Sequence, residues 1–330
     1  MTSLRKNKCE GHEDLEVREG SLFIVFKFFT VFMLMFLLLS PALSAQYPRV
    51  PNVIEITDYR KAMVTAPPAE LKLDPFYKKY ADATGVPIAG SEMVQDDAIL
   101  MARDIVSTML SKRADIRAEF IKRGGRVLVI AYEEGQTDLP EYRTMRKPAL
   151  DDPRLTPGER TRYNEPGGIG SQTDQQYWNG RARGMGGIRT SCAEENLLGY
   201  ADTRYYGEHI CVHEFSHGIM SAFRAIDEGL NTELQAAYAN AKEKGLFKGH
   251  YAENTIAEYW AEGTQWWFWS NYEWRDCSKG APGVTLWSPD DLKAYDPTLY
   301  GILEKVYDGH RIPADVYHAR KIRSAAPCKG

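Results

Sequence analysis

The chain has 330 residues, of which 43% are hydrophobic and 26% are charged, and its formal net charge is −4. This composition is typical of a globular protein, and the length suffices for one large or two small domains with a sizeable core. Lys and Arg form no block anywhere in the sequence, so we expect no nucleic acid as a partner.

An apolar run of 12 residues, FFTVFMLMFLLL at positions 28–39, follows Lys27 and ends at Ser40 and Pro41. This length is typical of a secretory signal peptide, whereas a membrane span needs about 20 apolar residues. Residues 1–45 are therefore predicted to be a signal peptide, so that the rest of the chain is secreted.

The polar segment that precedes this run is unusually long for a signal peptide, and two alternatives stay open. An uncleaved type II signal anchor would hold the exported part of the chain on the outer side of a membrane, and the membrane is a partner only in that case. A buried helix is the other alternative.

Export affects the interpretation of the five cysteines. Removal of the N-terminal segment takes away Cys9 and leaves an even set of four, which suggests two disulfides in an exported chain. We favour the pairs Cys192–Cys211 and Cys277–Cys328, because the members of each pair are near in sequence. Buried free thiols are the alternative. The sequence has no C-x-x-C pair, so a zinc site made of cysteines is not expected.

The first elements follow from composition and periodicity. Residues 46–73 are rich in Pro and polar residues and are expected to lie extended over the surface. A short helix followed by a turn is expected within residues 74–89. Apolar residues at helical spacing predict helices at 91–110 and 114–123. The β-branched run that follows Gly124 and Gly125 predicts a buried strand at 126–132.

The second half begins with a polar stretch, residues 138–180, whose prolines and glycines predict a long loop region. Residues 184–191 are expected to form an edge strand, which in a protease could bind an extended substrate by strand addition. The helices that follow are predicted at residues 207–226, 232–244, 255–270, 289–294 and 297–308. The whole pattern predicts an α+β fold with a mainly helical core and a small mixed sheet.

The stretch CVHEFSHGIM, Cys211 to Met220, contains the pattern His-Glu-x-x-His. His213 and His217 are four residues apart, so on a helix both imidazoles lie on one face, one turn apart. With Glu214 after the first histidine, this is the pattern of a zinc hydrolase. The alternative is a helix with surface or capped histidines. Zinc at such a site needs a third protein ligand.

The third ligand is not at the most familiar spacings, because Phe223 and Ala237 occupy the positions that two common patterns would use. Glu258 and Glu262, in HYAENTIAEYWAEGTQWWF, share one apolar face of a predicted helix, where carboxylates need a charge or metal partner. We assign Glu258 to the metal and Glu262 to the orientation of a ligating histidine. The alternative is that Thr255 and Glu258 only form a capping box.

Together, VHEFSHGI and HYAENTIAEYWAEGTQWWF resemble the catalytic core of the anthrax lethal factor-like gluzincins, and more loosely the Mlc titration factor peptidases. In the former family HEFGH is followed by a tyrosine, six residues and a glutamate within EFFAE. Tyr251 stands seven positions before Glu258, and EYWAE replaces EFFAE. The resemblance covers about residues 184–272, under a third of the chain. The departures are Trp260 for the second phenylalanine of EFFAE, a slightly shorter span between the motifs, and the export signal with its cysteines.

The resemblance implies a zincin-like metallopeptidase domain, placed here at residues 74–330, with one Zn²⁺ per chain. It implies that His213, His217 and Glu258 are the zinc ligands, and that Tyr251 stabilises the oxyanion. The family's catalytic base corresponds to Glu214.

The expected function is that of an exported zinc-dependent endopeptidase acting on peptide or protein substrates. In such a mechanism Glu214 takes a proton from zinc-bound water and passes it to the leaving amine, while Tyr251 and zinc hold the oxyanion. Two alternatives remain. One is a catalytically silent zinc-binding interaction protein, against which the intact Glu214 and Tyr251 argue. The other is a zinc hydrolase of non-peptide substrates.

Overall fold

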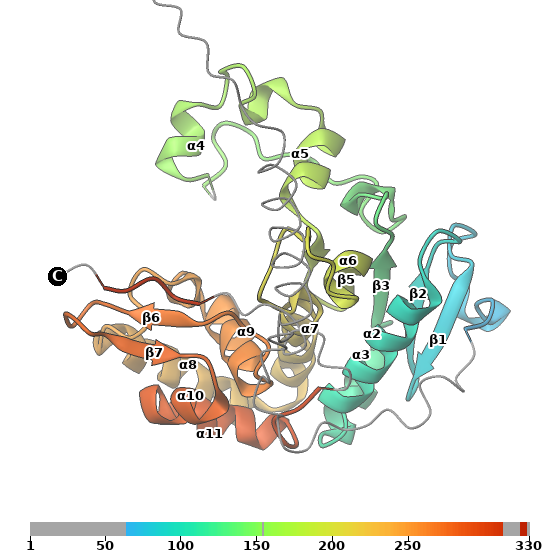
Figure 1. The fold of residues 1–330 in the computed structure, drawn as a ribbon. Helices are drawn as coiled ribbons and strands as arrows, with labels where there is room; N and C mark the ends of the chain where they lie inside the picture. Colours follow the sequence, from blue (N-terminus) through green and yellow to red (C-terminus); the bar gives the residue numbers. More distant parts are fainter. Residues whose placement is uncertain (1–63, 154, 313–323, 329–330) are drawn as a thin grey trace, which may run out of the picture. The chain divides into compact units, whose positions relative to one another are not determined.

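A computed structural model of the chain describes residues 64–153, 155–312 and 324–328 (Figure 1). All of them lie in the second of two units, residues 50–330. The predicted signal peptide or anchor, residues 1–45, and most of the predicted extended segment lie outside the described residues. Among the helices of the described part, none has the length and apolarity needed to cross a membrane.

A five-stranded mixed sheet has the strand order β1-β2-β3-β5-β4. The inner pairs β2–β3 and β3–β5 are parallel, and the outer pairs β1–β2 and β4–β5 are antiparallel. The predicted α+β class with a small mixed sheet is therefore confirmed. The strands are β1 (Lys79–Ala83), β2 (Val86–Gly90), β3 (Arg126–Ile130), β4 (Gly184–Met185) and β5 (Arg189–Ala193).

The helix expected within residues 74–89 is wrong, because this segment forms the β1–β2 hairpin. Thr84 and Gly85 connect the strands with φ angles of 52° and 94°, as in the two-residue turns that suit the twist of a hairpin. Pro87 lies at the beginning of β2, and the ladder to β3 begins only at Ile88. The missing N–H of the proline therefore costs no bond to the neighbouring inner strand.

Alternate residues of β3 enter different hydrophobic clusters, as the period of a strand requires. Val127 and Val129 belong to the main core, whereas Leu128 and Ile130 pack with Tyr77 in a second cluster. Three helices contribute to the main core beside the sheet: α2 (Asp96–Met109), α3 (Ala114–Lys122) and α7 (Ile210–Ile226). One side of α7 therefore packs against the sheet.

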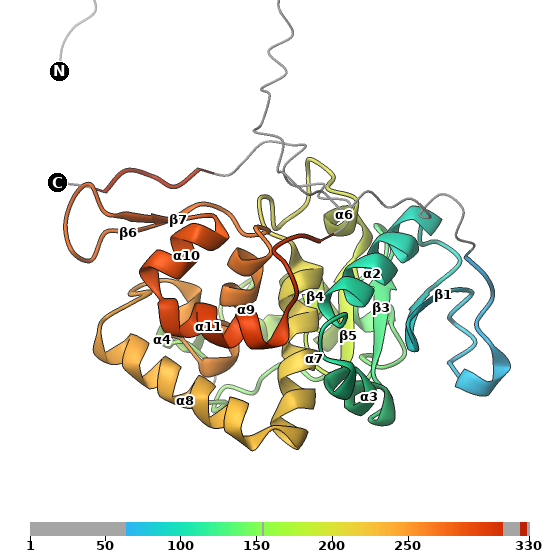
Figure 2. The ribbon, with the colours of Figure 1, turned by 90° about the horizontal axis from the view of Figure 1, so that it is seen from below.

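The other side of α7 contacts the C-terminal helices, so α7 lies between them and the sheet (Figures 1 and 2). All five helices predicted in the second half of the chain are present within a few residues of their predicted boundaries. A two-stranded sheet and several short helices were not predicted. The elements of this part are α8 (Glu228–Glu243), η5 (Tyr251–Glu253), α9 (Ile256–Trp267), β6 (Trp274–Asp276), β7 (Val284–Leu286), α10 (Pro289–Tyr295) and α11 (Pro297–Val306).

Two disulfides join Cys192 to Cys211 and Cys277 to Cys328, with Cα–Cα distances of 5.1 and 5.5 Å. This pairing is the one favoured from the sequence. The first disulfide is fully buried and connects β5 to the first turn of α7. It therefore ties the central sheet to the helix that carries the His-Glu-x-x-His pattern.

Residues 139–183, called the excursion below, contain short helices where only a long loop was expected. These are α4 (Pro157–Thr161), η4 (Ile169–Ser171) and α5 (Asp174–Arg181). Thr156 and Thr173 begin α4 and α5 with capping boxes, in which each hydroxyl accepts a hydrogen bond from a backbone N–H three residues on. The excursion has a small hydrophobic cluster of its own, formed by Leu155, Tyr163, Ile169 and Tyr177.

The single edge strand expected at residues 184–191 is instead two strands, β4 and β5, joined by a reversal at Gly186 and Gly187. Of these two strands, only β4 is an edge strand of the described sheet, because β5 pairs with β3 on its other side. Gly187 has a φ of 122°, which a residue with a side chain rarely adopts. The glycines of this stretch thus form a tight turn that the sequence analysis read as continuous strand.

Candidate metal centre

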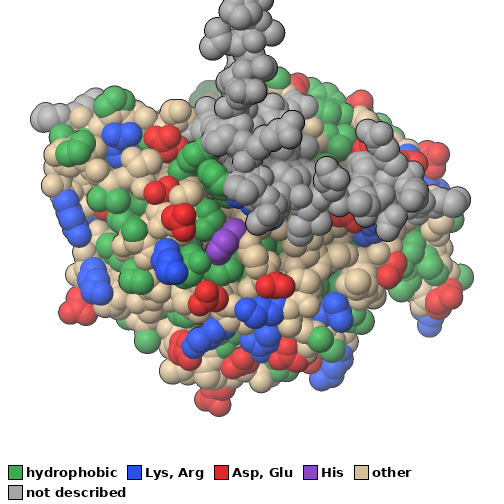
Figure 3. Space-filling view, turned by 60° about the horizontal axis from the view of Figure 1, so that its bottom comes forward, with side chains coloured by type: hydrophobic (Ala, Val, Ile, Leu, Met, Phe, Trp, Pro, Cys, Tyr) green, Lys and Arg blue, Asp and Glu red, His purple; other side chains and the backbone are tan. Residues whose placement is uncertain are grey.

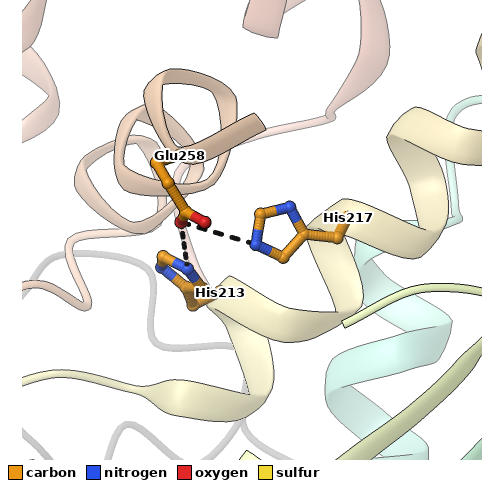
Figure 4. A group of neighbouring side chains, drawn as sticks. All are labelled: His213, His217 and Glu258. Atoms are coloured by element: carbon orange, nitrogen blue, oxygen red, sulfur yellow. Dashed lines mark hydrogen bonds and ion pairs between the residues drawn. The ribbon is translucent and has the colours of Figure 1, made fainter. Parts of the chain in front are cut away.

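Three predicted ligand side chains converge between two helices. His213 and His217 project from α7, and Glu258 projects toward them from α9 (Figure 4). The Oε2 atom of Glu258 lies 3.0 Å from Nε2 of His213 and 3.6 Å from Nε2 of His217. One potential ligand atom from each residue lies within 4.8 Å of the others. Ligands of a tetrahedral zinc ion are about 3.3 Å apart for metal–ligand bonds of about 2.0–2.2 Å, so these separations suit zinc.

The start of α9 sets the position of Glu258. Thr255 is the N-cap, and its hydroxyl accepts a hydrogen bond from the Glu258 backbone N–H at 3.2 Å. The carboxylate of Glu258 is not turned back to complete a capping box and lies against the two histidines instead. Glu258 therefore has two separate contacts: its backbone N–H bonds to the N-cap of α9, and its carboxylate lies in the candidate metal cluster.

The far side of the His213 ring is held by Gln265, which the sequence analysis missed. Oε1 of Gln265 lies 3.0 Å from Nδ1 of His213, while Nε2 of the same amide donates to the carbonyl of His209 at 3.2 Å. With the amide in this orientation, Nδ1 of His213 must carry the proton, which leaves the Nε2 lone pair for a metal. Gln265 stands seven residues after Glu258, two turns along the same face of α9, and this spacing was the available signal.

Glu262 was assigned the role of orienting a ligating histidine. It is 2% exposed, and its nearest oxygen is 3.6 Å from Nδ1 of His213, so Gln265 makes the shorter contact. Asn271 donates a hydrogen bond of 2.6 Å to Glu262, and His250 Nε2 is 4.0 Å away. Burial raises the pKa of Glu262 to about 7. The structure thus brings Glu262 beside the centre, and its role there stays a prediction.

Glu214 follows the first histidine on α7 and lines the same cavity as the three ligands. Burial raises the pKa of Glu214 to about 7, with the charge of His213 and a hydrogen bond from the Gly186 backbone acting in the opposite direction. A carboxylate with a pKa near neutrality can both accept and return a proton at neutral pH. Its environment therefore suits a general base.

The electrostatics of the centre call for a cation. Burial lowers the pKa of His213, but the hydrogen bond to Glu258 and the charges of Glu214 and Glu262 outweigh it and raise this pKa to about 10. Burial lowers the pKa of His217 to about 4. A proton on His213 thus balances the surrounding carboxylates when no metal is present. A divalent cation bound by neutral histidines would supply that positive charge, so the donor set and its surroundings fit zinc.

Tyr251 lies on η5, just before α9, and is 53% exposed. Its ring centroid is 6.3 Å from that of His213, and its hydroxyl interacts with Glu258. Burial of the hydroxyl and the nearby carboxylates raise the pKa of Tyr251, so the phenol stays protonated at neutral pH. It is therefore available as a hydrogen-bond donor at the mouth of the site.

A cavity of about 690 Å³ opens on the centre. The ligands, Glu214 and Tyr251 line it together with strand β4 and the end of the excursion, including Trp178 and Arg181. Acidic and basic side chains are interspersed over the face of the molecule drawn in Figure 3. The cavity is thus large enough for several residues of an extended peptide and has the edge of the described sheet as one wall.

Comparisons with known proteins add little to this geometry. No family model matches the chain, and no curated protein matches it. Among solved structures, the chain is similar to the PRO-PRO endopeptidase (PPEP-2) from Paenibacillus alvei, with 13% sequence identity and a TM-score of 0.40, over 67% of this chain and 97% of that one. A similarity this distant supports no functional argument. The more specific resemblance to lethal factor-like gluzincins finds no support in these comparisons and stays a prediction.

Proposed function

We propose that this protein is an exported zinc-dependent endopeptidase with a zincin-like catalytic domain. The observation that carries the proposal is the convergence of His213, His217 and Glu258 at ligand distances, with Glu214 beside them in one cavity. Two of these residues are histidines and one is a carboxylate, a donor set that leaves the fourth position of a tetrahedral zinc ion open for water or substrate.

Bound zinc would lower the pKa of a coordinated water and polarise the carbonyl of the scissile bond. Glu214 would accept the proton of the attacking water and deliver it to the leaving amine, since its carboxylate lines the same cavity as the three candidate ligands. The Tyr251 hydroxyl would donate a hydrogen bond to the oxygen on which negative charge develops. Gln265 would keep the His213 ring in the tautomer that a metal ligand needs.

The two disulfides support the proposal of export, because such bonds persist in oxidising compartments. The apolar run at residues 28–39 supports the same proposal from the sequence. A secreted protein and a type II anchored protein would both place the metal centre outside the cytoplasm.

A peptide is the proposed substrate because the cavity is bordered by β4, an edge strand among the described strands. An extended peptide can pair with such an edge through backbone hydrogen bonds. A silent zinc-binding protein has no need of the half-buried Glu214 carboxylate beside the ligands. A hydrolase of non-peptide substrates keeps the same metal chemistry and differs only in what the cavity accepts.

The test is a comparison of the wild type with Glu214→Gln on a proteome-derived peptide library. We expect both proteins to bind one zinc ion per chain, and only the wild type to cleave. The substitution His213→Ala should remove the zinc. Identical peptide patterns for wild type and Glu214→Gln would overturn the peptidase proposal, and full zinc content in His213→Ala would show that the site is misplaced.

A further inference from the structure

The turn between β4 and β5 lies directly against the helix that carries the histidines. A Cβ atom built on Gly186 would lie 2.5 Å from Cδ2 and 2.7 Å from Cβ of His217. Separations under about 3 Å are well inside the contact distance of two carbon atoms. The backbone of Gly186 thus fills the space beside the imidazole, and no side chain fits between them.

Two further glycines make the same close approach. A Cβ on Gly184 would lie 2.6 Å from Cγ2 of Ile210 and 3.2 Å from Cγ of Glu214. A Cβ on Gly218 would lie 2.6 Å from the carbonyl oxygen of Gly187. The strand and the helix are therefore in contact through positions that lack side chains, which lets the edge of the sheet reach the metal centre.

Gly186 and Gly187 are glycines for different structural reasons. Gly187 has a φ of 122°, and an added Cβ would meet nothing within 4 Å. Glycine is therefore favoured at this position by the backbone conformation alone. Gly186 has an ordinary φ, so it is glycine because of the space that His217 occupies. The same residue also donates its backbone N–H to the Glu214 carboxylate. One residue thus touches a predicted metal ligand and the predicted base.

From these contacts we infer that Gly186 is a positioning residue for the metal centre, which holds the His217 ring against α7 in the orientation required for metal binding. The inference rests on the proposed function for the identity of the metal. The atoms of His217 that Gly186 abuts are Cβ, Cγ and Cδ2, which lie close to the helix backbone. A turn about χ1 can carry Cγ and Cδ2 away from an added methyl group, but it would also carry Nε2 away from Glu258. The contact with Cβ can be relieved only by a shift of the backbone, since Cβ lies on the χ1 axis.

The first experiment compares Gly186→Ala with Gly180→Ala, a control in α5 where an added Cβ has nothing within 4 Å and no strained φ. Zinc affinity is measured by competition with a chromophoric chelator. We expect Gly186→Ala to bind zinc at least 10-fold more weakly than the wild type, and Gly180→Ala to stay within 2-fold. An affinity of Gly186→Ala within 2-fold of the wild type would overturn the inference.

A second experiment uses metal-free protein and does not depend on zinc or on turnover. The thermal midpoint is measured for the wild type, Gly186→Ala, His217→Gly and the double variant. We expect Gly186→Ala to lower the midpoint in the presence of His217 and to have little effect in the His217→Gly background, because the Cβ and ring atoms that the added methyl group would meet are gone. An equal decrease in both backgrounds would overturn the inference.

The double variant also covers the case in which Gly186→Ala does not fold, since recovery of folding on removal of His217 would support the contact directly. Failure to recover would contradict it. If the wild type bound no zinc at all, the proposed function would fail, while the metal-free comparison would still decide whether Gly186 positions His217.

Discussion

The contact between α7 and α9 and the excursion of residues 139–183 are stabilised in different ways. At the α7–α9 contact, Trp260 is fully buried, packs its ring against Phe223 at 5.2 Å, and donates its indole N–H to the carbonyl of Ser216 at 2.9 Å. This arrangement combines a large buried aromatic surface with a satisfied polar group. The candidate metal ligands thus project from two helices that are fixed to each other.

The excursion depends more on polar side chains that bond to its backbone. Lys147 donates through Nζ to the carbonyls of Ile169 and Gly170 at 2.9 and 2.8 Å, and the hydroxyl of Tyr163 donates to the carbonyl of Pro148 at 2.7 Å. Its own hydrophobic cluster has four residues. Segments with little buried apolar surface open locally at a lower free energy than the core.

This difference indicates that the two walls of the cavity have unequal stability. The metal side is built on the core helices, whereas Trp178 and Arg181, which line the other side, belong to the last helix of the excursion. A stable metal side preserves the ligand geometry, and a less stable opposite wall can adjust to a substrate. The predictions for Trp260, Lys147 and Gln265 below test this contrast.

The largest expected effect concerns Trp260. Trp260→Ala should lower the free energy of unfolding by about 3–5 kcal/mol, because it removes a fully buried ring and leaves the Ser216 carbonyl without that donor. The measurement is urea-induced unfolding followed by circular dichroism. Trp178→Ala, in the half-buried excursion helix, is the control and should change the transition by much less. Equal losses of stability in the two variants would show that the two regions do not differ in stability.

Lys147 tests the excursion in the same way. Lys147→Met should raise the frequency of local opening within the excursion about 10-fold or more, because a hydrogen bond from a charged donor contributes about 1.5–3 kcal/mol. Hydrogen exchange followed by mass spectrometry should show faster exchange in residues 139–183 and an unchanged rate in α7. Lys248→Met, at an exposed position, is the control. Faster exchange in α7 as well would mean that the excursion and the core open together.

The sequence could bring the candidate ligands to attention because their spacing follows the helix period. His213 and His217 are four residues apart, and Glu258 begins a run of polar residues on one face of a second apolar helix. Gln265 lies on that same face and was missed because an uncharged amide among aromatic residues suggests no charge that must be paired. The roles of the predicted residues still depend on the proposed function.

Local pattern failed where the structure depends on single backbone angles or on contacts between distant segments. The β1–β2 hairpin depends on left-handed conformations at Thr84 and Gly85, and Thr84 is not a typical residue for them. Helices α4 and α5 have five and eight residues, too few for periodicity to outweigh the surrounding prolines and glycines. The need for glycine at position 186 arises from His217, 31 residues further on, and is invisible in the sequence.

A substitution at Gln265 tests whether the candidate ligand His213 depends on its buried hydrogen-bond partner for metal binding. Gln265→Met should weaken zinc binding about 10- to 100-fold, since the His213 Nδ1–H loses its nearest acceptor. The control is Gln136→Met, which changes another fully buried glutamine, whose amide oxygen accepts a hydrogen bond from Ser191. Both variants should lose stability, but only the first should lose zinc affinity in chelator competition. Unchanged affinity would assign the orientation of His213 to Glu262.

The smallest expected effect lies at Asp227, which connects the end of α7 to α8. Its carboxylate accepts the Leu230 backbone N–H at 2.9 Å as the N-cap of α8, and it pairs with Arg113 at 3.0 Å. Asp227→Ala should lower the free energy of unfolding by about 1 kcal/mol, as other losses of an N-cap do. Asp227→Asn keeps the cap and removes the charge, so it should lose less.

The acid dependence of the same pair of variants separates the cap from the charge. The Leu230 N–H bond and the Arg113 guanidinium both lower the pKa of Asp227 in the folded protein. A carboxyl with a lowered folded pKa contributes stability above its unfolded pKa of 3.8, and this contribution is lost as the pH falls through the folded pKa. The gap in unfolding midpoint between the wild type and Asp227→Asn, measured on metal-free protein, should therefore be constant above about pH 5 and shrink below pH 3.8. A gap that stays constant down to pH 2 would contradict the lowered pKa of Asp227 and would show that ionisation of its carboxylate contributes nothing to stability.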